Sequence, residues 1–279
     1  MDHHVTSGNP VPDRTPKRVR HEIRVRSLDV ARVCRIAPNM VRVTLTGEEL
    51  RGFASVGFDD HLKMFFPGPG RTVPDLPIVG PKGIEMPEGV ARPIARDYTP
   101  RRYDPVANEL DIDFAIHEDG PATQWAVNVK VGDRAWIGGP RGSFVVPFAF
   151  DWHLLIGDET ALPAIARRLE ELPAGSRVVV VAEVENAANE LELASDADVT
   201  VVWVHRGERA AGEPVGFMEA LEGLQWLSGD YHAWISCESL VAKDLRTYLI
   251  DNRGANPKWM RASGYWRRGA AGMHDHFDE

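Results

Sequence analysis

The sequence predicts two domains in one chain, an antiparallel β domain followed by an α/β domain built on a parallel sheet. Three observations support this prediction. Apolar and polar residues alternate with a period of two in the first half of the chain. Near Asp151 this pattern gives way to continuous apolar runs separated by segments with helical spacing. A chain of 279 residues, 43% of them hydrophobic, is also long enough to form two modest hydrophobic cores.

The first half contains short segments with the alternation of strands that bury one face. The clearest are 41–45 and 110–116, in which every second residue is apolar. Shorter candidates lie between glycine and proline residues at 61–66, 134–137 and 143–146. Short strands at this spacing are typical of a small antiparallel barrel.

In the second half, strands and helices are expected to alternate. The apolar run 153–156 is followed by apolar residues at helical spacing up to Pro173, which ends the helix. Further buried strands are expected at 177–184, 199–204 and 231–236, with helices at 216–224 and 240–252. This alternation indicates a parallel sheet, and such sheets bind ligands at the carboxyl ends of their strands.

The expected organisation has four parts. These are a flexible arm at 1–20, a β domain at 21–149, an α/β domain at 150–272 and a flexible tail at 273–279. Within the β domain, residues 67–92 are rich in Pro and Gly and show no periodicity, so we expect a long surface loop there.

Composition excludes several kinds of partner and site. The 32 basic and 41 acidic residues give a net charge of −9, which disfavours nucleic acid or anionic lipid as a partner. Two cysteines, Cys34 and Cys237, are too few for a disulfide framework or a thiolate metal site, and they suit a reducing cytoplasm. The N-terminus lacks the apolar core of a secretory signal, and no apolar run is long enough to span a membrane. The basic segment 14–26 is expected to be a solvated arm rather than a nucleic-acid-binding tail.

Several catalytic signatures are missing, which leaves cofactor or binding chemistry. The chain contains no GxxxxGK[ST], HExxH, GxSxG or paired Cys-x-x-Cys motif. Histidine pairs at His3–His4 and at His274 and His276 have no carboxylate shell around them, so we predict no metal site.

The first candidate segment is 96–103, RDYTPRRY. On a strand, Arg96 and Tyr98 share one face, so a cation and a flat aromatic ring point the same way, beside the hydroxyl of Thr99. A phosphate and a planar ring could bind there together. The alternative is an edge strand whose arginines pair with Asp97 and Asp104.

The second candidate is 117–126, HEDGPATQWA, directly after an alternating strand. Pro121 is well placed at the first helical position after Gly120, so we expect a short helix whose free N–H groups could hold a diphosphate. Ala122 is small enough to let a ligand approach, and Thr123 could add a hydroxyl donor. The alternative is an ordinary capped helix with Trp125 in the core.

The third candidate is 157–161, GDETA, between the first parallel strand and its helix. Nucleotides dock at such junctions in open α/β sheets. Against this, Asp158 and Glu159 put negative charge near any phosphate, and Thr160 could simply cap the helix.

Taken together, these segments resemble the siderophore-interacting protein family of bacterial NAD(P)H-dependent ferric-siderophore reductases. The likeness spans roughly residues 20 to 272. The motifs that carry it, in chain order, are Arg96-x-Tyr98-Thr99, His117-x-x-Gly120-Pro121-Ala122-x-x-Trp125-Ala126, Gly139-Pro140-Arg141-Gly142-Ser143, Gly157-Asp158-Glu159-Thr160-Ala161 and Gly264-Tyr265-Trp266-Arg267-Arg268-Gly269.

The resemblance implies a ferredoxin-reductase-like architecture, with a six-stranded antiparallel flavin-binding barrel followed by a pyridine-nucleotide domain. It implies FAD and NAD(P)H as cofactors, with NADPH preferred, and a cytoplasmic enzyme that passes electrons to the iron(III) of a siderophore. A flavin suits this reaction because it accepts two electrons and can pass them on singly. Iron is then substrate and needs no protein ligand.

The resemblance also implies roles for particular residues. Arg96 would hold an FAD phosphate, while Tyr98 and Thr99 would be catalytic, stacking on the flavin ring and contacting its reactive edge. The remaining cofactor contacts would be Asp113 and His117 at the ring and ribityl portion, Gly120, Ala122 and Thr123 at the diphosphate, Gly157, Asp158, Glu159, Thr160 and Ala161 on the nicotinamide side, and Tyr265 and Trp266 over the flavin.

An anionic ferric siderophore, of the catecholate or hydroxamate type, requires a local cluster of cations on a chain of net charge −9. Lys63, Arg141 and Arg267 are the candidates, and each could equally be an ordinary surface charge.

Two questions remain open at this level. Glu183 and Glu185 could accept from the ribose 2′-OH of NADH, whereas Arg206 and Arg209 could bind the 2′-phosphate of NADPH. The rival functions are a flavoprotein that exchanges electrons with a ferredoxin, and a non-catalytic protein that binds siderophore or flavin.

Overall fold

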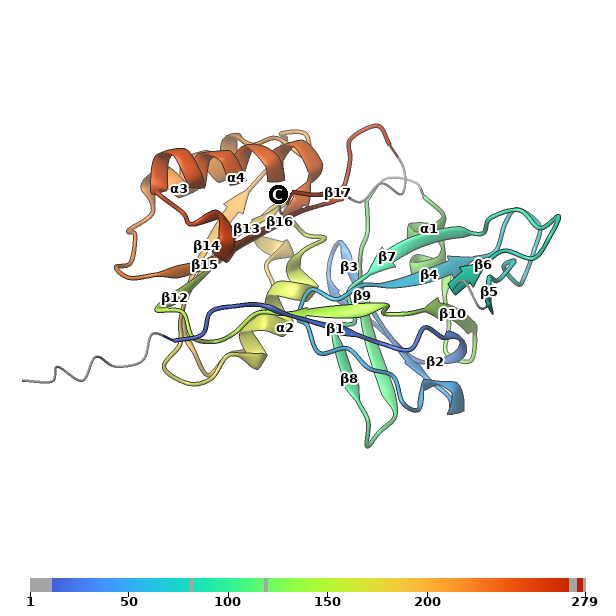
Figure 1. Cartoon of the computed structure of the whole chain (residues 1–279). Helices are drawn as coiled ribbons and strands as arrows, with labels where there is room; N and C mark the ends of the chain where they lie inside the picture. The colour runs from blue at the N-terminus through green and yellow to red at the C-terminus, as the bar shows by residue number, and fades with distance from the viewer. Residues whose placement is uncertain (1–11, 81–82, 118–119, 271–274, 278–279) are drawn as a thin grey trace, which may run out of the picture.

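The computed structural model describes residues 12–80, 83–117, 120–270 and 275–277, and its strands form two large sheets (Figure 1). The first is wholly antiparallel, and the second contains five neighbouring parallel strands. The predicted order, an antiparallel β region followed by a parallel α/β region, is confirmed.

The antiparallel sheet has seven strands. In spatial order they are β7 (Ile94–Tyr98), β4 (Leu62–Phe66), β10 (Arg134–Gly138), β2 (Val25–Ala37), β3 (Met40–Thr46), β9 (Glu109–Ala115) and β8 (Arg102–Asp104). The six-stranded closed barrel that the resemblance implies differs from this arrangement, because among the described residues the end strands β7 and β8 do not pair with each other. The sheet curls instead, so that side chains of β7 reach those of β9.

The parallel sheet lies in the second half of the chain. Its strands, in spatial order, are β14 (Asp198–His205), β13 (Arg177–Val184), β12 (Trp152–Gly157), β15 (Tyr231–Glu238), β16 (Met260–Trp266) and the antiparallel β17 (Asp275–His276). Four of the parallel strands match the predicted runs. Strand β16 was not predicted, because its sequence MRASGYW is neither a continuous apolar run nor a clear alternation.

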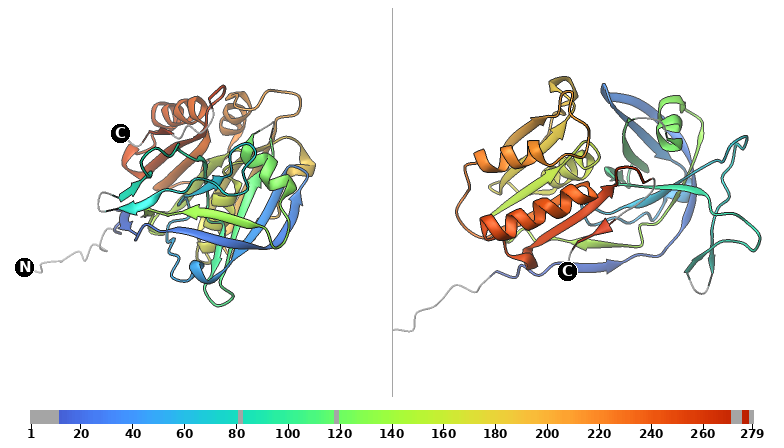
Figure 2. Two further views of the ribbon diagram at one scale, coloured as in Figure 1. Left: turned by 90° about the vertical axis from the view of Figure 1, so that its right-hand side faces the viewer. Right: turned by 90° about the horizontal axis from the view of Figure 1, so that it is seen from above.

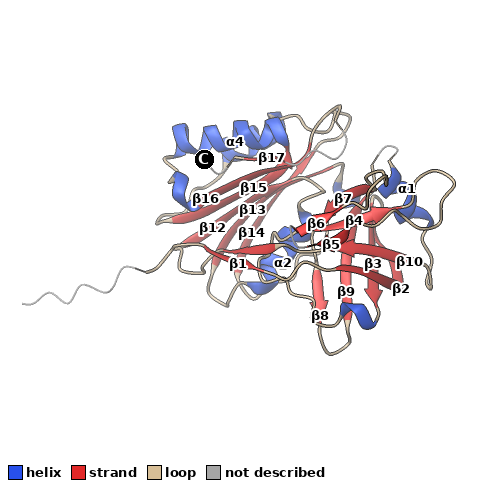
Figure 3. Ribbon diagram, turned by 45° about the vertical axis from the view of Figure 1, so that its right-hand side comes forward, coloured by secondary structure: helices blue, strands red, loops and turns tan. Residues whose placement is uncertain are grey.

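Helices α2 (Leu162–Glu171), α3 (Val215–Gly223) and α4 (Ser239–Arg253) follow strands of the parallel sheet, and α1 (Pro121–Asn128) follows β9. In Figure 3, α4 lies on one side of the parallel sheet and α2 on the other. Short 3-10 turns are η1 (Glu48–Leu50), η2 (Ala187–Asn189) and η3 (Pro257–Trp259). No helix in the described ranges is long and apolar enough to cross a bilayer.

The side of the parallel sheet that carries α2 shares a hydrophobic core with the antiparallel region. Phe58 and Met40 from the first region are buried together with Leu155, Ile165 and Trp234 from the second. The rings of Phe58 and Trp234 meet edge to face at 5.4 Å. The two regions are therefore packed against each other rather than simply linked.

Two small sheets lie where the sequence predicts a loop and an arm. Within 67–92, strands β5 (Ile78–Gly80) and β6 (Gly83–Glu85) pair and project away from the parallel sheet (Figure 2). The end of the expected arm forms β1 (Lys17–Arg20), which pairs with β11 (Gly142–Val145). Backbone pairing orders these four residues although all of them are exposed.

Candidate active site

Strand β7 carries the first predicted motif, and its register shows which side chains share a face. Arg96 stands opposite Met64 of β4, and Tyr98 stands opposite Leu62. Met64 and Leu62 are buried in the core, so Arg96 and Tyr98 both lie on this face of the sheet. The prediction that Arg96 and Tyr98 share one face of a strand is confirmed.

A row of aromatic rings connects β7 with α1. Tyr98 packs on Phe114 of β9 with ring centroids 4.4 Å apart. Phe114 packs on Trp125 of α1 at 5.4 Å, and Trp125 meets Phe66 of β4 at 5.9 Å. Tyr98 and Trp125 are far apart in the sequence, but in the fold the ring of Phe114 contacts both of them.

The N-terminus of α1 offers backbone N–H groups to a ligand. Gly120 is its N-cap, Pro121 occupies its first position, and no side chain caps the helix among the described residues. Ala122 and Thr123 of the first turn are buried. An uncapped helix start with small side chains is a suitable site for a phosphate group.

The residues on this side fit a flavin nucleotide. A Cβ added to Gly120 would meet no atom of the described residues within 4 Å. Arg96 is half-buried, and its Nη1 donates to its neighbour's carbonyl, Ala95 O, at 2.8 Å. No described carboxylate pairs with Arg96. A partly desolvated cation near the ring of Tyr98 suits a phosphate joined to a planar ring, and the free N–H groups of α1 suit the diphosphate.

At the end of β12, Gly157 allows α2 to begin very close to the sheet. A Cβ at Gly157 would lie 2.8 Å from Ser236 O of β15 and would collide with the side chain of Ala161. Glycine is therefore required by close packing at this position. The predicted junction of a strand end with a helix start exists as expected.

Asp158 follows Gly157 and is buried. Its carboxylate accepts from the backbone N of Thr160 at 2.9 Å, from Thr160 Oγ1 at 2.6 Å, and from Trp266 Nε1 at 2.7 Å. Burial raises the pKa of Asp158, and these three hydrogen bonds act in the opposite direction. The alternative in which Thr160 caps α2 is not observed, because the N-cap is Ala161 and no side chain caps the helix.

Strand β16 connects the two halves of the site. Its Trp266 donates to Asp158, as described above, while the preceding Tyr265 contacts the other region. The hydroxyl groups of Thr99 and Ser236 lie close enough to the phenol of Tyr265 to lower its pKa, although burial raises that pKa by more. Tyr265 also meets Trp234 edge to face at 6.1 Å. One short strand thus joins the Thr99 segment to the Gly157–Ala161 junction.

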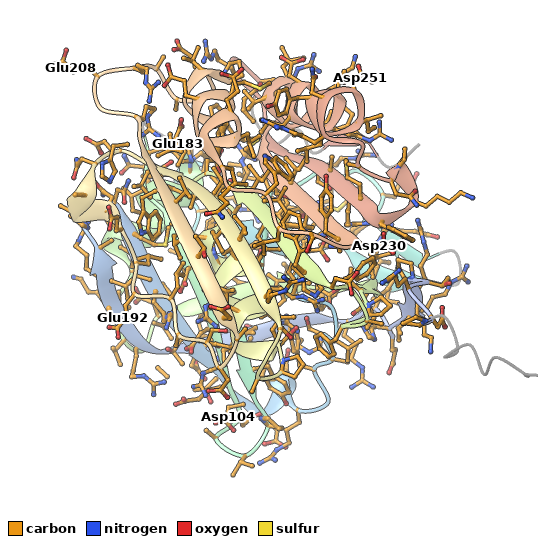
Figure 4. All side chains as sticks on the ribbon, turned by 90° about the vertical axis from the view of Figure 1, so that its left-hand side faces the viewer. Asp104, Glu183, Glu192, Glu208, Asp230 and Asp251 are labelled. Atoms are coloured by element: carbon orange, nitrogen blue, oxygen red, sulfur yellow. The ribbon has the colours of Figure 1, made fainter. Side chains whose placement is uncertain are left out.

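The carboxyl ends of the parallel strands are rich in acidic groups. Arg206 Nη1 lies 3.1 Å from Glu159 and 3.4 Å from Glu183. Burial, and then the nearby charge of Asp158, raise the pKa of Glu183 to about 7, although Arg206 lowers it. Figure 4 shows Glu183 near the end of β13, away from Asp230, which precedes β15.

The sequence reasoning missed a contact that positions Thr99. Arg167 of α2 donates from Nη1 to Pro100 O at 2.9 Å and to Ser55 Oγ at 2.8 Å. The helix therefore holds the chain immediately after Thr99. A charged residue at helical spacing reads as a solvated surface position, so the sequence carried no signal for this role.

A second missed contact joins the two regions through Asp59. Its Oδ2 accepts from Arg261 Nε at 2.6 Å and from Trp234 Nε1 at 3.1 Å. All three side chains are at least half-buried. This cross-region network fixes the start of β16, and hence the strand that carries Tyr265.

Asp113 is not brought to the face of the sheet that carries Tyr98. Asp113 alternates with Phe114 along β9, so it faces the opposite side of the sheet from the aromatic row. There it pairs with Arg42 at 2.7 Å and lies 4.0 Å from Arg101. His117 is exposed in the segment before α1. We therefore leave Asp113 out of the flavin site.

The three predicted substrate cations are all exposed. Lys63 Nζ lies 2.7 Å from Asp97 Oδ1, so its charge is already partly balanced. Lys63 stands opposite Gly138 of β10, and Arg141 follows three residues after that strand ends. Arg267 comes directly after β16, and no described contact joins it to the other two.

The arrangement defines a fold class: a curled antiparallel region followed by a parallel α/β region, as in ferredoxin reductases. A ferredoxin-NADP+ reductase from Plasmodium falciparum shares this fold with a TM-score of 0.54 and 12% identity, covering 84% of this chain and 94% of its own. Within this class the chain belongs to the siderophore-interacting protein family. Its residues 29–144 match the siderophore-interacting FAD-binding domain, and residues 150–269 match the siderophore-interacting protein domain.

Individual relatives agree with this assignment. The chain is 40% identical to the NADPH-dependent ferric-chelate reductase of Escherichia coli, covering 91% of this chain and 97% of the relative. It is 32% identical to the ferric vibriobactin reductase ViuB of Vibrio cholerae, over 85% and 89% of the two chains. The crystal structure of a siderophore utilization protein from T. fusca superposes with a TM-score of 0.86 at 37% identity, covering 94% of this chain and 99% of the other.

Proposed function

We propose that this protein is an FAD-dependent ferric-siderophore reductase that takes electrons from NADPH. The observation that carries the proposal is the position of β16, which places Tyr265 beside Thr99 and bonds Trp266 to Asp158. A reductase of this kind requires its flavin and nicotinamide sites to be adjacent, and this strand would bring the two proposed sites together. Membership of the family and its named ferric reductases supports the same reaction.

The flavin would be held by the region that we assign to residues 21–149. Arg96 would pair with a phosphate, the N–H groups of Ala122 and Thr123 would bind the diphosphate, and Tyr98 would stack on the ring. Thr99 would donate to the reactive edge, and His117 would lie near the ribityl portion. When bound, FAD would supply the ability to accept two electrons as a hydride and to pass them on one at a time.

The nicotinamide side would be formed by the region that we assign to residues 150–272. Gly157 lets α2 begin close to the end of β12, so that Thr160 and Ala161, just before the helix, would lie beside the nicotinamide ring. Asp158 and Glu159 would stabilise the positive charge on an oxidised nicotinamide ring, which favours hydride donation. Trp266 donates to Asp158 and so keeps its carboxylate oriented, and Tyr265 would separate the flavin edge from solvent.

Electron transfer would release iron because the ligands of siderophores are hard oxygen donors. Such donors hold iron(III) far more tightly than iron(II), so one electron loosens the metal. Lys63, Arg141 and Arg267 would attract the anionic chelate. We place the reaction in the cytoplasm, where the exposed thiol of Cys34 would remain reduced.

An anaerobic absorption spectrum tests the proposal directly. Purified protein reconstituted with FAD should show flavin bands that bleach on addition of NADPH and return on addition of a ferric siderophore. The same experiment with NADH measures the nucleotide preference, and reduced ferredoxin tests the alternative electron donor. Bands that bleach but do not return would contradict ferric reduction, and protein that takes up no FAD would contradict every flavin-based function.

A further inference from the structure

One arginine is shared by two carboxylates at the carboxyl end of the parallel sheet. Arg206, directly after β14, places its Nη1 atom 3.1 Å from Glu159 Oε1 and 3.4 Å from Glu183 Oε1. Glu159 lies just beyond β12, and Glu183 lies near the end of β13. Because β14, β13 and β12 are neighbours in the sheet, this one guanidinium connects the ends of three strands.

The charges around Arg206 do not balance. The exposed fractions of the side chains are 13% for Arg206, 12% for Glu159 and 3% for Glu183. Burial, and then the nearby charge of Asp158, raise the pKa of both glutamates. Three poorly hydrated carboxylates around one cation favour a state in which one carboxyl group keeps a proton.

Glu183 is the carboxyl group best placed to keep that proton. Asp158 accepts three hydrogen bonds, from Thr160 and Trp266, which favour its ionised form. Among the hydrogen bonds of the described residues, the side chain of Glu183 accepts only from Arg206, at 3.4 Å. The pKa of Glu183 is about 7, so both of its forms are present near neutral pH.

Within the described residues, no second cation forms an ion pair with Glu183. At the end of β15, burial raises the pKa of the Cys237 thiol, which is therefore neutral. The next residue, Glu238, is a further acid, and it accepts from the first backbone N–H groups of α4. Helix α3 also contacts β13, and it turns Phe217 and Leu221 rather than a charged group toward the sheet.

The turn after β14 carries a second arginine. Arg209 donates from Nε to Arg206 O at 3.1 Å, and no carboxylate of the described residues forms an ion pair with it. Gly212 in the same turn packs against Trp266, because a Cβ there would lie 2.9 Å from the indole ring. The turn therefore borders the proposed nicotinamide side of the site, where Trp266 bonds Asp158.

We propose that Arg206 binds a phosphate group of the pyridine nucleotide, and that Glu183 takes up a proton from solvent when it does so. The inference rests on the proposed function, which brings NADPH to this edge of the sheet. While Glu183 is ionised, two carboxylates neutralise Arg206 and repel the phosphate. Once Glu183 is neutral, the guanidinium keeps Glu159 on one side and turns free N–H groups to the phosphate. Arg206 is then the binding residue, and Glu183 is a positioning residue that acts through it.

Two parts of the nucleotide carry this chemistry. The diphosphate is common to NADH and NADPH, whereas the 2′-phosphate occurs in NADPH alone. Both present anionic oxygens that suit a guanidinium. A comparison of the two nucleotides therefore identifies which phosphate Arg206 binds, while proton uptake tests whether Glu183 takes part.

Titration calorimetry of the full chain with FAD bound measures the proton directly. NADP+ and NAD+ are titrated at pH 7.5 in two buffers of different ionisation enthalpy, since the difference in heat gives the number of protons taken up. The unchanged protein should take up about half a proton per NADP+, because this pH lies just above the pKa of Glu183. Glu183→Gln, which keeps the shape of the side chain but cannot ionise, should take up none.

Glu208→Gln is the matched control. Glu208 is an exposed carboxylate in the same turn as Arg206, and Figure 4 shows it on an outer loop, apart from Glu183. This variant should take up as much of a proton as the unchanged protein. In steady-state assays, the KM for NADPH should rise about fourfold between pH 7 and pH 8.5 in the unchanged protein and in the control, but stay within twofold in Glu183→Gln.

Each outcome of the calorimetry decides a separate question. Proton uptake with both nucleotides assigns Arg206 to the diphosphate, and uptake with NADP+ alone assigns it to the 2′-phosphate. Nucleotide binding without proton uptake, or with equal uptake in Glu183→Gln, would overturn the inference and leave the reductase in place. A flavin that NADPH does not bleach would instead contradict the proposed function.

The unchanged protein tests the inference even where Glu183→Gln does not fold. Its proton uptake should decline as the pH is lowered to 6, because Glu183 already holds its proton there. Uptake that stays constant between pH 6 and pH 7.5 would exclude Glu183 as the group that takes up the proton.

Discussion

The two sides of the candidate active site differ in charge. The antiparallel side presents Arg96 and the uncapped start of α1, with no described carboxylate paired to the arginine. The parallel side presents Asp158, Glu159 and Glu183, with Arg206 as their cation. A strand end followed by a helix start occurs on both sides, but only the antiparallel side is suited to a diphosphate. A helix N-terminus at a sheet edge is therefore not sufficient to identify a phosphate site, because neighbouring charges decide what can bind.

The largest expected effect is the loss of FAD affinity on replacing Arg96. Arg96→Gln should weaken FAD binding about 100-fold, because charge-assisted bonds to phosphate are worth about 1.5–3 kcal/mol. Flavin fluorescence titration measures this affinity. Lys130→Gln, which removes an exposed cation distant in sequence from the motif, should leave it within twofold. Equal affinities in the two variants would remove Arg96 from the flavin site.

On the parallel side, the next prediction concerns the close packing of Gly157 and its effect on stability. Gly157→Ala should lower the free energy of unfolding by about 1–3 kcal/mol, because the new methyl group meets Ser236 O and the side chain of Ala161. Gly223 ends α3, and a Cβ added there would meet no described atom within 4 Å, so Gly223→Ala should instead raise the free energy of unfolding slightly. Urea unfolding compares the two. A neutral Gly157→Ala would mean that α2 can move away from the sheet at little cost.

Trp266→Phe tests the link between the two sides. Losing the indole N–H leaves buried Asp158 with one donor fewer, which should cost about 1–3 kcal/mol of stability and weaken NADPH binding. Trp226→Phe provides the control, since it also loses an indole hydrogen bond, to Leu221 O at 3.3 Å. The control should leave the KM for NADPH unchanged. Parallel changes in KM would show that Trp266 acts only through general stability.

The last prediction concerns the dependence of stability on pH. Glu183 has a pKa of about 7 in the folded protein, above its ordinary value of 4.5, so the folded state binds this proton more tightly than the unfolded chain. The free energy of unfolding should therefore fall as pH rises through this interval. Glu183→Gln removes the contribution, and its stability should fall less between pH 5 and pH 8. Identical pH profiles from urea unfolding would contradict the raised pKa.

Local patterns were sufficient to predict the elements that carry the separate motifs. The alternation around Tyr98, the Gly-Pro start of α1 and the apolar run before Gly157 each depend on neighbours within a few residues. Such patterns report burial and backbone preference directly. They led to the family resemblance, to two separate sheets and to the junction at Gly157–Ala161.

By itself, the sequence determined the order of the two regions and suggested which residues could form a flavin site, because those signals are local in the chain. Only the tertiary structure decided which of these residues meet. It placed Trp266 on Asp158 and Tyr265 beside Thr99, turned Asp113 away, and folded the basic arm into β1 beside Arg141. Each of these outcomes depends on strand pairing or packing between residues far apart in sequence, and no local pattern records such contacts.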